Sequence, residues 1–417
     1  MTVSTRRSVG TVAAIGIGVG SMLGAGVFSD MWVKVLEAGN FYLLALGIAG
    51  VIASANALST AQLASRYHEA GGAYAYGREE LGHFVGHVAG AAFVVGKTVS
   101  AAVAGLVIAA YIAPGHAPLV ATGAIALAWA LNSRGITRTA AGATISAMVV
   151  TCALAAISIG ALSAHHQTTG GALATSPQHS APLAVLVGAS VAFFAFAGYA
   201  RIATLSEEVR DPRRAIPRAI VVALVIVFAV YALIAVALVR TVGARLLETG
   251  GTPIETLAGV AGVAVWIVRV IAVVAVFGAL LAVMAGAGRT LMAMARNGDV
   301  PVGLAAQARG GAPARAEAVV AVLAVGVAWT RGVSLILVSV ASVLIYYAVA
   351  NVAAIAQHRA QRTAALRVPI AVSGVGLVGC VVLGAVALPS AADGWVAPLV
   401  VVGAVFAWPA VAALVRR

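Results

Sequence analysis

One stretch near the amino end of the chain reads Gly16-Ile-Gly-Val-Gly-Ser-Met-Leu-Gly-Ala-Gly-Val-Phe28, and five of its thirteen residues are glycine. Each glycine in a helix costs roughly 1 kcal/mol relative to alanine, so a continuous helix is unfavourable between Ser21 and Gly26. The stretch is nevertheless apolar enough for a membrane. In lipid, a helix break is tolerated only where the freed N–H groups are buried in protein or face a polar cavity or ligand. The stretch therefore predicts a broken transmembrane helix with a ligand site at the break.

The composition of the whole chain is that of a polytopic membrane protein. Of its 417 residues, 62% are hydrophobic and only 9% are charged, and the mean hydropathy is +1.04. The formal net charge of +13 falls between apolar runs rather than on one basic face, so we expect no nucleic-acid partner. The two cysteines, Cys152 and Cys380, lie inside apolar runs and are expected to be small buried hydrophobic residues. We predict no cofactor and no metal site.

The apolar runs predict twelve transmembrane helices, because a membrane-spanning helix needs roughly 20 mainly apolar residues. The predicted spans cover residues 9–33, 42–65, 84–111, 118–131, 139–162, 182–205, 216–239, 263–294, 316–329, 333–356, 368–388 and 395–415. The expected fold class is therefore an all-α integral membrane protein.

Lysine and arginine placement orients the chain, because these residues concentrate in cytoplasmic loops. With the amino terminus inside, nineteen of the 26 basic residues fall on the cytoplasmic side, four fall outside, and three lie in or at the edge of spans. We therefore expect a multi-pass protein of the cell (cytoplasmic) membrane with both termini in the cytoplasm.

The sixth span is the expected counterpart of the first. Its stretch Val191-Ala-Phe-Phe-Ala-Phe-Ala-Gly-Tyr-Ala200 places Gly198 among aromatic residues near the middle of the membrane. The first and sixth spans run in opposite directions, as two inverted repeats of five spans require. A second broken helix is therefore predicted at Gly198. The alternative is that Gly198 only permits close helix packing, as small residues often do in membranes.

Four stretches resemble one known family in their order and spacing. They are Gly20-Ser-Met-Leu-Gly-Ala-Gly-Val-Phe28, Leu63-Ala-Ser-Arg-Tyr-His-Glu-Ala-Gly-Gly-Ala-Tyr-Ala-Tyr76, Phe193-Phe-Ala-Phe-Ala-Gly-Tyr199 followed by Glu207-Glu-Val-Arg-Asp-Pro-Arg-Arg-Ala-Ile-Pro-Arg-Ala-Ile220, and Gly288-Arg-Thr-Leu-Met-Ala-Met-Ala-Arg-Asn-Gly-Asp-Val-Pro301. Together they resemble the amino acid, polyamine and organocation (APC) transporter superfamily, and the chain is identified as a bacterial amino acid permease of that superfamily. The resemblance covers roughly residues 9–356, whereas the last two spans match only in position.

The resemblance implies the inverted-repeat fold of the leucine-transporter type, with about 12 transmembrane helices. Its first repeat would cover residues 9–162 (spans one to five) and its second repeat residues 182–356 (spans six to ten). Two peripheral helices would cover residues 368–415. In this fold the substrate lies at the membrane midplane, between the two broken helices.

The two breaks suit the two charged groups of an amino acid. Free N–H groups at the N-terminus of a half-helix attract a carboxylate, and freed carbonyls attract an ammonium group. By the resemblance, Phe194 would close over the substrate, with Phe196 and Tyr199 behind it as further gating residues. The predicted substrate-binding residues are Met22, Gly24, Ala25, Gly26, Phe194, Ala195, Ala197 and Gly198, among which Gly24, Ala25 and Gly26 would hold the carboxylate.

A cationic substrate is not expected. Some relatives carry a polar or acidic residue directly after the sixth-span glycine, where this chain has Ala200. The predicted spans contain essentially no acidic residue that could pair with a dication. We therefore expect a neutral or small amino acid. The neighbouring Arg201 either faces the site or extends to the cytoplasmic interface, and the interface is the favoured position.

The charges within the spans predict how transport is driven. A sodium site of this fold uses hydroxyl groups of the eighth span, but residues 270–288 contain no serine or threonine. The fifth span lacks the lysine that many proton-coupled relatives carry. The only deeply placed charge is Lys97 of the third span, and we expect it to exchange a proton during transport. The alternatives are a structural contact between Lys97 and the freed carbonyls, or an ammonium group that reaches the interface.

The sequence therefore predicts a secondary active transporter that moves an amino acid by alternating access. Its expected partners are the small-molecule substrate, H⁺ and the lipid bilayer, and its oligomeric state is left open. An amino acid or amine exchanger and a passive facilitator without ion coupling are the alternatives. We expect no enzyme, because no span carries paired carboxylates, a Ser/His constellation or a metal-ligand cluster.

Overall fold

A computed structural model describes residues 9–67, 71–134, 140–164, 180–203, 209–243, 252–308, 311–330, 334–360, 364, 366–391 and 403. The described chain consists of helices joined by loops, with one isolated bridge between Val9 and Val209. The helices are α1 (Thr11–Met22), α2 (Met31–Leu36), η1 (Gly39–Phe41), α3 (Tyr42–Ala64), α4 (Ala73–Leu81), α5 (His83–Ile112), η2 (Pro114–His116), α6 (Ala117–Ser133), α7 (Ala140–Ser163), α8 (Ala181–Phe196), η3 (Ala197–Tyr199), α9 (Ala200–Ala203), α10 (Pro212–Thr241), α12 (Pro253–Val260), α13 (Val265–Arg296), η4 (Val302–Ala305), α14 (Ala314–Ala328), α15 (Leu335–Arg359) and α16 (Ile370–Ser390). The expected all-α membrane fold is confirmed.

Nine helical segments of the described chain are long and apolar enough to cross a membrane. Apolar helices suit lipid because a helix satisfies its backbone hydrogen bonds internally. The nine segments match predicted spans two to eight, ten and eleven. The ninth predicted span corresponds to the shorter helix α14, and the twelfth lies outside the described residues. The total of twelve spans stays a prediction.

The first predicted span is interrupted where its glycines predict a break. α1 ends at Met22, residues 23–30 form turns, and α2 begins at Met31. The sixth span behaves differently, because α8 continues through η3 into α9. The backbone there tightens into a 3-10 turn at Gly198 rather than unwinding. The break between Ser21 and Gly26 is thus confirmed, and the sixth span is interrupted more mildly.

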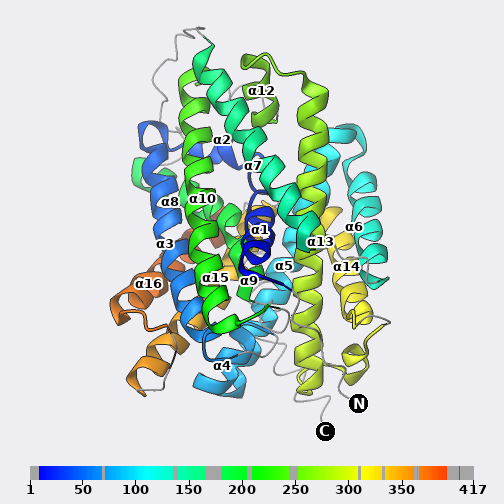
Figure 1. The fold of residues 1–417 in the computed structure, drawn as a ribbon, viewed down its shortest axis with the longest axis vertical. Coiled ribbons are helices and arrows are strands. Elements are labelled where there is room, and N and C mark those ends of the chain that lie inside the picture. Colours follow the sequence, from blue (N-terminus) through cyan, green and yellow to red (C-terminus); the bar gives the residue numbers. More distant parts are fainter. Residues whose placement is uncertain are drawn as a thin grey trace.

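α1 lies near the middle of the bundle (Figure 1), where it contacts η3 and α9 of the second interrupted helix. α1 packs against α7 and α10, and α8 packs against α3 and α15. The long helices α5 and α13 pack against each other, and α14 lies against α6 and α5. α16 packs on the outside of α15 and α3 (Figure 1). Side chains that point away from the bundle are apolar, such as Val225 and Trp266, as contact with lipid requires.

Short helices distinguish the two ends of the bundle. α12 lies at one end, at the top of Figure 1, and α4 lies at the opposite end. We refer to them as the α12 end and the α4 end. The amide of Arg210 donates to the carbonyl of Val9 at 2.8 Å, which ties the start of α1 to the segment that precedes α10.

An acidic residue of a predicted span lies inside the bundle, contrary to the expectation from the sequence. Glu317, in the first turn of α14, is 1% exposed. Its side chain lies against Gly288 of α13, where an added Cβ would come within 2.3 Å of Glu317 Cγ. The sequence placed this residue at the very start of a short span, where an interfacial carboxylate is also common, so its burial was not evident.

Candidate functional site

A small cavity lies between the two helix interruptions and the long helices α5 and α13. It consists of two adjoining spaces that share Ser21, Lys97, Gly198 and Val283. Its lining is formed by Ser21, Met22, Ala25, Gly26, Phe93, Lys97, Ser100, Ala104, Phe194, Ala195, Gly198, Arg201, Ala279, Ala282, Val283 and Gly286. Of the eight residues predicted to bind substrate, all except Gly24 and Ala197 belong to this lining.

Glycine brings the two interruptions into direct contact. A Cβ added to Gly198 would lie 2.6 Å from the carbonyl carbon of Ser21, and one added to Gly26 would lie 2.6 Å from the Cα of Ala195. Non-bonded atoms do not approach so closely, so only glycine fits at these two positions. Gly198 therefore does permit the close packing that was its alternative interpretation. The same contact forms one wall of the cavity.

The turn after α1 presents backbone N–H groups beside the cavity. The amide of Leu23 still donates to the carbonyl of Val19 at 2.8 Å. Within the described chain, no such bond is donated by the amides of Gly24, Ala25 or Gly26, and all three residues are buried. Buried amides without an acceptor are costly. These are the groups that a carboxylate would accept hydrogen bonds from.

Two tyrosine hydroxyls form hydrogen bonds with backbone carbonyls at the interruptions. Tyr231 of α10 lies 2.7 Å from the Met22 carbonyl oxygen and 3.2 Å from that of Ala195. Tyr347 of α15 donates to the carbonyl of Ala197 at 3.1 Å. A carbonyl oxygen accepts up to two hydrogen bonds, so Tyr231 alone does not saturate the carbonyls of Met22 and Ala195, whereas the Ala197 carbonyl also lies 3.4 Å from Lys97 Nζ. Tyr231 thus holds the Met22 and Ala195 carbonyls in place while leaving them available.

Lys97 reaches the cavity from the middle of α5. Its Nζ atom lies 3.4 Å from the Ala197 carbonyl oxygen and 5.7 Å from the centre of the Phe93 ring, and the residue is only 7% exposed. A separation of 3.4 Å is longer than an ordinary N–H···O bond. Among the described residues, no carboxylate lies within ion-pair distance of this nitrogen. Lys97 therefore faces the cavity with a weakly satisfied ammonium group.

The three predicted gating residues occupy two different environments. Phe194 is half-buried and lines the cavity. Phe196 is 1% exposed and packs edge-on against Tyr231 with a centroid distance of 5.1 Å. Tyr199 is fully buried and stacks on Tyr347 with a centroid distance of 5.1 Å. Phe196 and Tyr199 thus stand behind the cavity wall, whereas Phe194 borders the space itself.

Arg201 also lines the cavity, which is the less favoured of its two expected positions. The buried carboxyl of Glu317 interacts electrostatically with Arg201 and Arg289, and the side chain of Asn132 hydrogen-bonds to it. The positive charge of Arg201 therefore has a buried acidic counterpart. The sequence alone did not connect these residues, because they come from four different helices.

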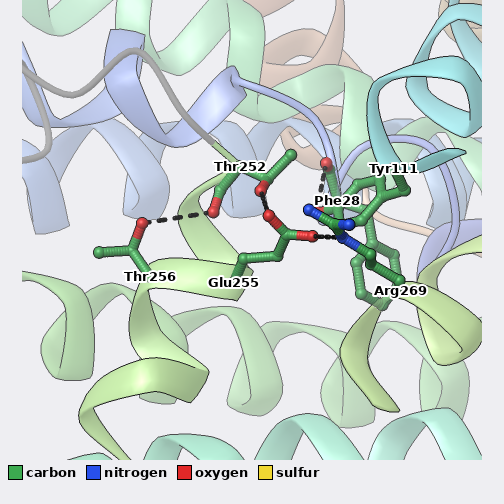
Figure 2. Close-up of polar contacts among 6 residues, drawn as sticks. All are labelled: Phe28, Tyr111, Thr252, Glu255, Thr256 and Arg269. Carbon is green, nitrogen blue, oxygen red and sulfur yellow. Dashed lines mark hydrogen bonds and ion pairs between the residues drawn. The ribbon is translucent and has the colours of Figure 1, made fainter. Parts of the chain in front are cut away.

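A polar cluster joins the helices at the α12 end (Figure 2). The Nε atom of Arg269 donates to Glu255 at 2.8 Å, and the Thr252 hydroxyl bonds to the same carboxylate. The hydroxyl of Tyr111 lies beside this cluster and donates to the Phe28 carbonyl at 3.1 Å. The contacts connect α12 and α13 to one another and connect α5 to the turn between α1 and α2.

A second cluster joins the helices at the α4 end around Asp299, which follows α13. The carboxylate accepts hydrogen bonds from the Tyr74 hydroxyl and from Arg78, each at 2.7 Å. His87 Nδ1 lies 3.8 Å away. Burial raises the pKa of Asp299, but the nearby His87, the hydrogen bond from Tyr74 and the charge of Arg78 outweigh it and hold the pKa well below its usual range. The cluster fastens α4 to α13 and to the start of α5.

Sequence reasoning did not identify several residues of this site. Tyr231, Tyr347 and Ser100 all contribute, the last as part of the cavity lining. A usable signal was present, because a tyrosine in the middle of an apolar span needs a partner for its hydroxyl. The sequence does not reveal which carbonyl that partner is.

Known proteins resemble this chain over most of its length. The profile of the amino acid permease family matches residues 14–412. Uncharacterized transporters of Mycobacterium tuberculosis and Mycobacterium bovis are each 41% identical over 394 residues, which cover 92% of this chain and 87% of those proteins. Cationic amino acid transporter 4 of Arabidopsis thaliana, a vacuolar protein, is 29% identical over 373 residues, which cover 82% of this chain and 62% of that protein. The chain therefore belongs to the amino acid permease family, a family of transporters within the APC superfamily.

Proposed function

We propose that this protein is a secondary active transporter that moves an amino acid across the cell membrane by alternating access. One observation carries the proposal, namely the cavity between the two interrupted helices. The amides of Ala25 and Gly26, which line the cavity, donate no described hydrogen bond, and Gly24 precedes them in the same turn; Met22 and Ala195 also belong to the lining. A carboxylate suits the amides and an ammonium group suits the carbonyls, so an amino acid is the molecule that would use both.

An inverted repeat of residues 9–162 and 182–356 is part of this proposal. The helix contacts support it, because α1 packs against α10 and α7 while α8 packs against α3 and α15. A pseudo-twofold axis that exchanges the two segments would exchange these pairs. It would also map the pair α5 and α13, and the pair α6 and α14, onto themselves, and the helices of both pairs are in contact.

Alternating access needs closures on both sides of the cavity. We assign the outer closure to the cluster around Glu255 and Arg269, and the inner closure to the cluster around Asp299 and Arg78. Phe194 would close over the substrate itself, with Phe196 and Tyr199 supporting it from behind. The charge distribution of the sequence supports a cytoplasmic location for the α4 end.

Proton coupling through Lys97 is the proposed driving mechanism. A protonated Lys97 attracts a negatively charged group into the cavity, and a deprotonated Lys97 does not. Proton and substrate would therefore be carried together. An exchanger or a passive facilitator would also use this cavity but would not need the proton.

A cationic substrate is disfavoured, although some relatives are named cationic amino acid transporters. Lys97 and Arg201 line the cavity, and no aspartate or glutamate is among its lining residues. A lysine or arginine side chain would therefore meet charges of its own sign.

Uptake by proteoliposomes tests the proposal. We expect saturable, stereoselective uptake of an amino acid that rises when the outside is made acidic and falls when a protonophore is added. Lys97→Ala should remove the response to the proton gradient. Lys34→Ala is the matched control, because Lys34 is exposed and pairs with Glu37 outside the cavity.

Two results would contradict proton coupling. One is unchanged pH-dependent uptake in the Lys97→Ala variant. The other is uptake that requires amino acid inside the vesicles and ignores the proton gradient, which would identify an exchanger. Uptake that does not saturate would instead indicate a facilitator.

A further inference from the structure

We propose that the substrate of this cavity carries an acidic side chain, of the size of aspartate or glutamate, and that Lys97 binds the side-chain carboxylate. The inference rests on the proposed function, because it assigns a ligand class to the same cavity. It differs from what the sequence predicts, which is a neutral or small amino acid without further definition.

The first step concerns the positive charge in the cavity that no acidic side chain of the protein balances. Two cationic side chains line it, Lys97 and Arg201. Arg201 has the buried carboxyl of Glu317 as an electrostatic counterpart. Lys97 has a carbonyl oxygen at 3.4 Å and an aromatic ring at 5.7 Å, and both contacts are weak for an ammonium group. One positive charge in the cavity is therefore left for the ligand to neutralise.

The second step concerns the hydrogen bonds that Lys97 can still make. An ammonium group has three donors. The single described hydrogen bond of Lys97 is the long one to Ala197. A carboxylate offers several acceptor positions and the opposite charge, so it satisfies the remaining donors best. A neutral amide or hydroxyl would accept a bond but leave the charge uncompensated.

The third step assigns the two carboxylates of such a ligand to different parts of the cavity. The amides of Gly24, Ala25 and Gly26, in the turn after α1, suit the carboxylate on the α-carbon. Lys97 belongs to α5, which lines the cavity together with α13 through residues such as Ala104 and Val283. The ligand side chain would extend toward these helices. Its carboxylate then meets Lys97, while the first carboxylate stays on the amides.

The charge balance ranks three classes of amino acid. An acidic amino acid carries a net charge of −1 and neutralises the remaining positive charge. A neutral zwitterion leaves that charge in place, and a basic amino acid adds another to it. The expected order of affinity is therefore acidic, then neutral, then basic.

Calorimetric titration of the purified full-length protein tests this order. The probes are L-aspartate and L-glutamate, their near-isosteric amides L-asparagine and L-glutamine, and L-lysine. At a pH of about 6 the carboxylates are ionised and an ordinary lysine is protonated. We expect the acids to bind about tenfold or more tightly than the matching amides, since hydrogen bonds to charged groups are strong.

The Lys97→Met variant tests whether Lys97 is the source of the preference for acids over amides. The variant keeps a side chain of similar length but removes the charge, so the preference for acid over amide should shrink to within about threefold. Lys34→Met is the matched control and should retain the preference, because Lys34 is an exposed lysine that pairs with Glu37. The wild-type ranking decides the main question even if Lys97→Met fails to fold.

Four results would overturn the inference. If the amides bind wild-type protein as tightly as the acids, the side-chain assignment is wrong while the proposed function stands. If Lys97→Met keeps the full preference, Lys97 is not its source. If Lys97→Met weakens acids and amides equally, Lys97 binds the α-carboxylate instead. If no amino acid binds at all, the proposed function fails and the inference fails with it.

Discussion

At the scale of single residues, Tyr231 makes the most informative contacts of the site. Its hydroxyl reaches the carbonyls of Met22 and Ala195, one from each interrupted helix, and its ring packs against Trp32 and Phe196. The side chain is fully buried. A single hydroxyl thus ties the end of α1 to α8 next to the cavity. This makes Tyr231 a positioning residue for the carbonyls that the proposed ammonium site uses.

We expect Tyr231→Phe to lower both stability and transport. The change removes the one O–H donor that the two buried carbonyls share, which costs on the order of 1–3 kcal/mol of unfolding free energy. It also frees the two interruptions to move relative to each other, so the KM for uptake should rise. Thermal unfolding of the purified protein and uptake kinetics measure the two effects. Tyr42→Phe is the control, because Tyr42 belongs to α3 and does not line the cavity; equal effects in both variants would refute the positioning role.

At the scale of elements, polar contacts join helices at both ends of the bundle. α4 is a short helix between the long helices α3 and α5, and it is fastened to the end of α13 through Asp299. The ion pair between Arg78 and Asp299 is largely buried, with side-chain exposures of 15% and 7%. Such a pair is costly to break on one side, because the remaining charge stays buried. The Asp299 cluster, which we propose as the inner closure, therefore requires an ionised carboxylate.

Stability should fall in acid because of Asp299. Its pKa in the folded protein is held well below the unfolded value of about 3.9, so the ionised carboxylate stabilises the fold above that value. The stabilisation is lost as the pH falls below about 4 toward the folded pKa. Asp299→Asn should therefore be less stable near neutral pH, by about 1–3 kcal/mol, and should lose less on acidification than the wild type.

Thermal unfolding over a range of pH checks this prediction. Glu37→Gln is the matched control, because it removes a carboxylate from the solvent-exposed pair with Lys34. Exposed pairs contribute little, so that variant should change stability by about 1 kcal/mol or less. A pH dependence of Asp299→Asn identical to that of the wild type would show that another group controls the acid response.

At the scale of the whole molecule, the helix contacts and the charges of the loops agree with the same proposed topology. The pairs α1 with α10 and α8 with α3 are those that the proposed inverted repeat exchanges. The basic residues concentrate at the end that carries α4, which the proposal places in the cytoplasm. Both features concern the entire chain, so a single measurement of topology bears on them together.

Reporter fusions test this topology. A fusion after residue 116, between α5 and α6, should lie outside the cell, and a fusion after residue 360, beyond α15, should lie in the cytoplasm. Alkaline phosphatase should therefore be active at the first position and inactive at the second, and green fluorescent protein should show the opposite pattern. The reversed pattern at both positions would refute the orientation, and the same pattern at both would refute the proposed number of spans between them.

Much of the fold could be predicted because its signals are local. A long apolar run predicts a membrane helix from length and composition, and the glycines after Gly16 predict the break that follows Met22. The milder change at Gly198 was harder to predict. A single glycine permits a break but does not require one, and the contact with Ser21 decided the geometry.

The sequence by itself determined the helical membrane fold, the position of the first break and the presence of one deeply placed lysine. Only the tertiary structure decided that Lys97 and Arg201 face one cavity, that Glu317 is buried beside Arg201, and that Tyr231 bridges the two interruptions. The physical reason is that these helices are apolar almost all round. Their hydrophobic pattern therefore does not indicate which face points inward, and only the packing of neighbouring helices selects it.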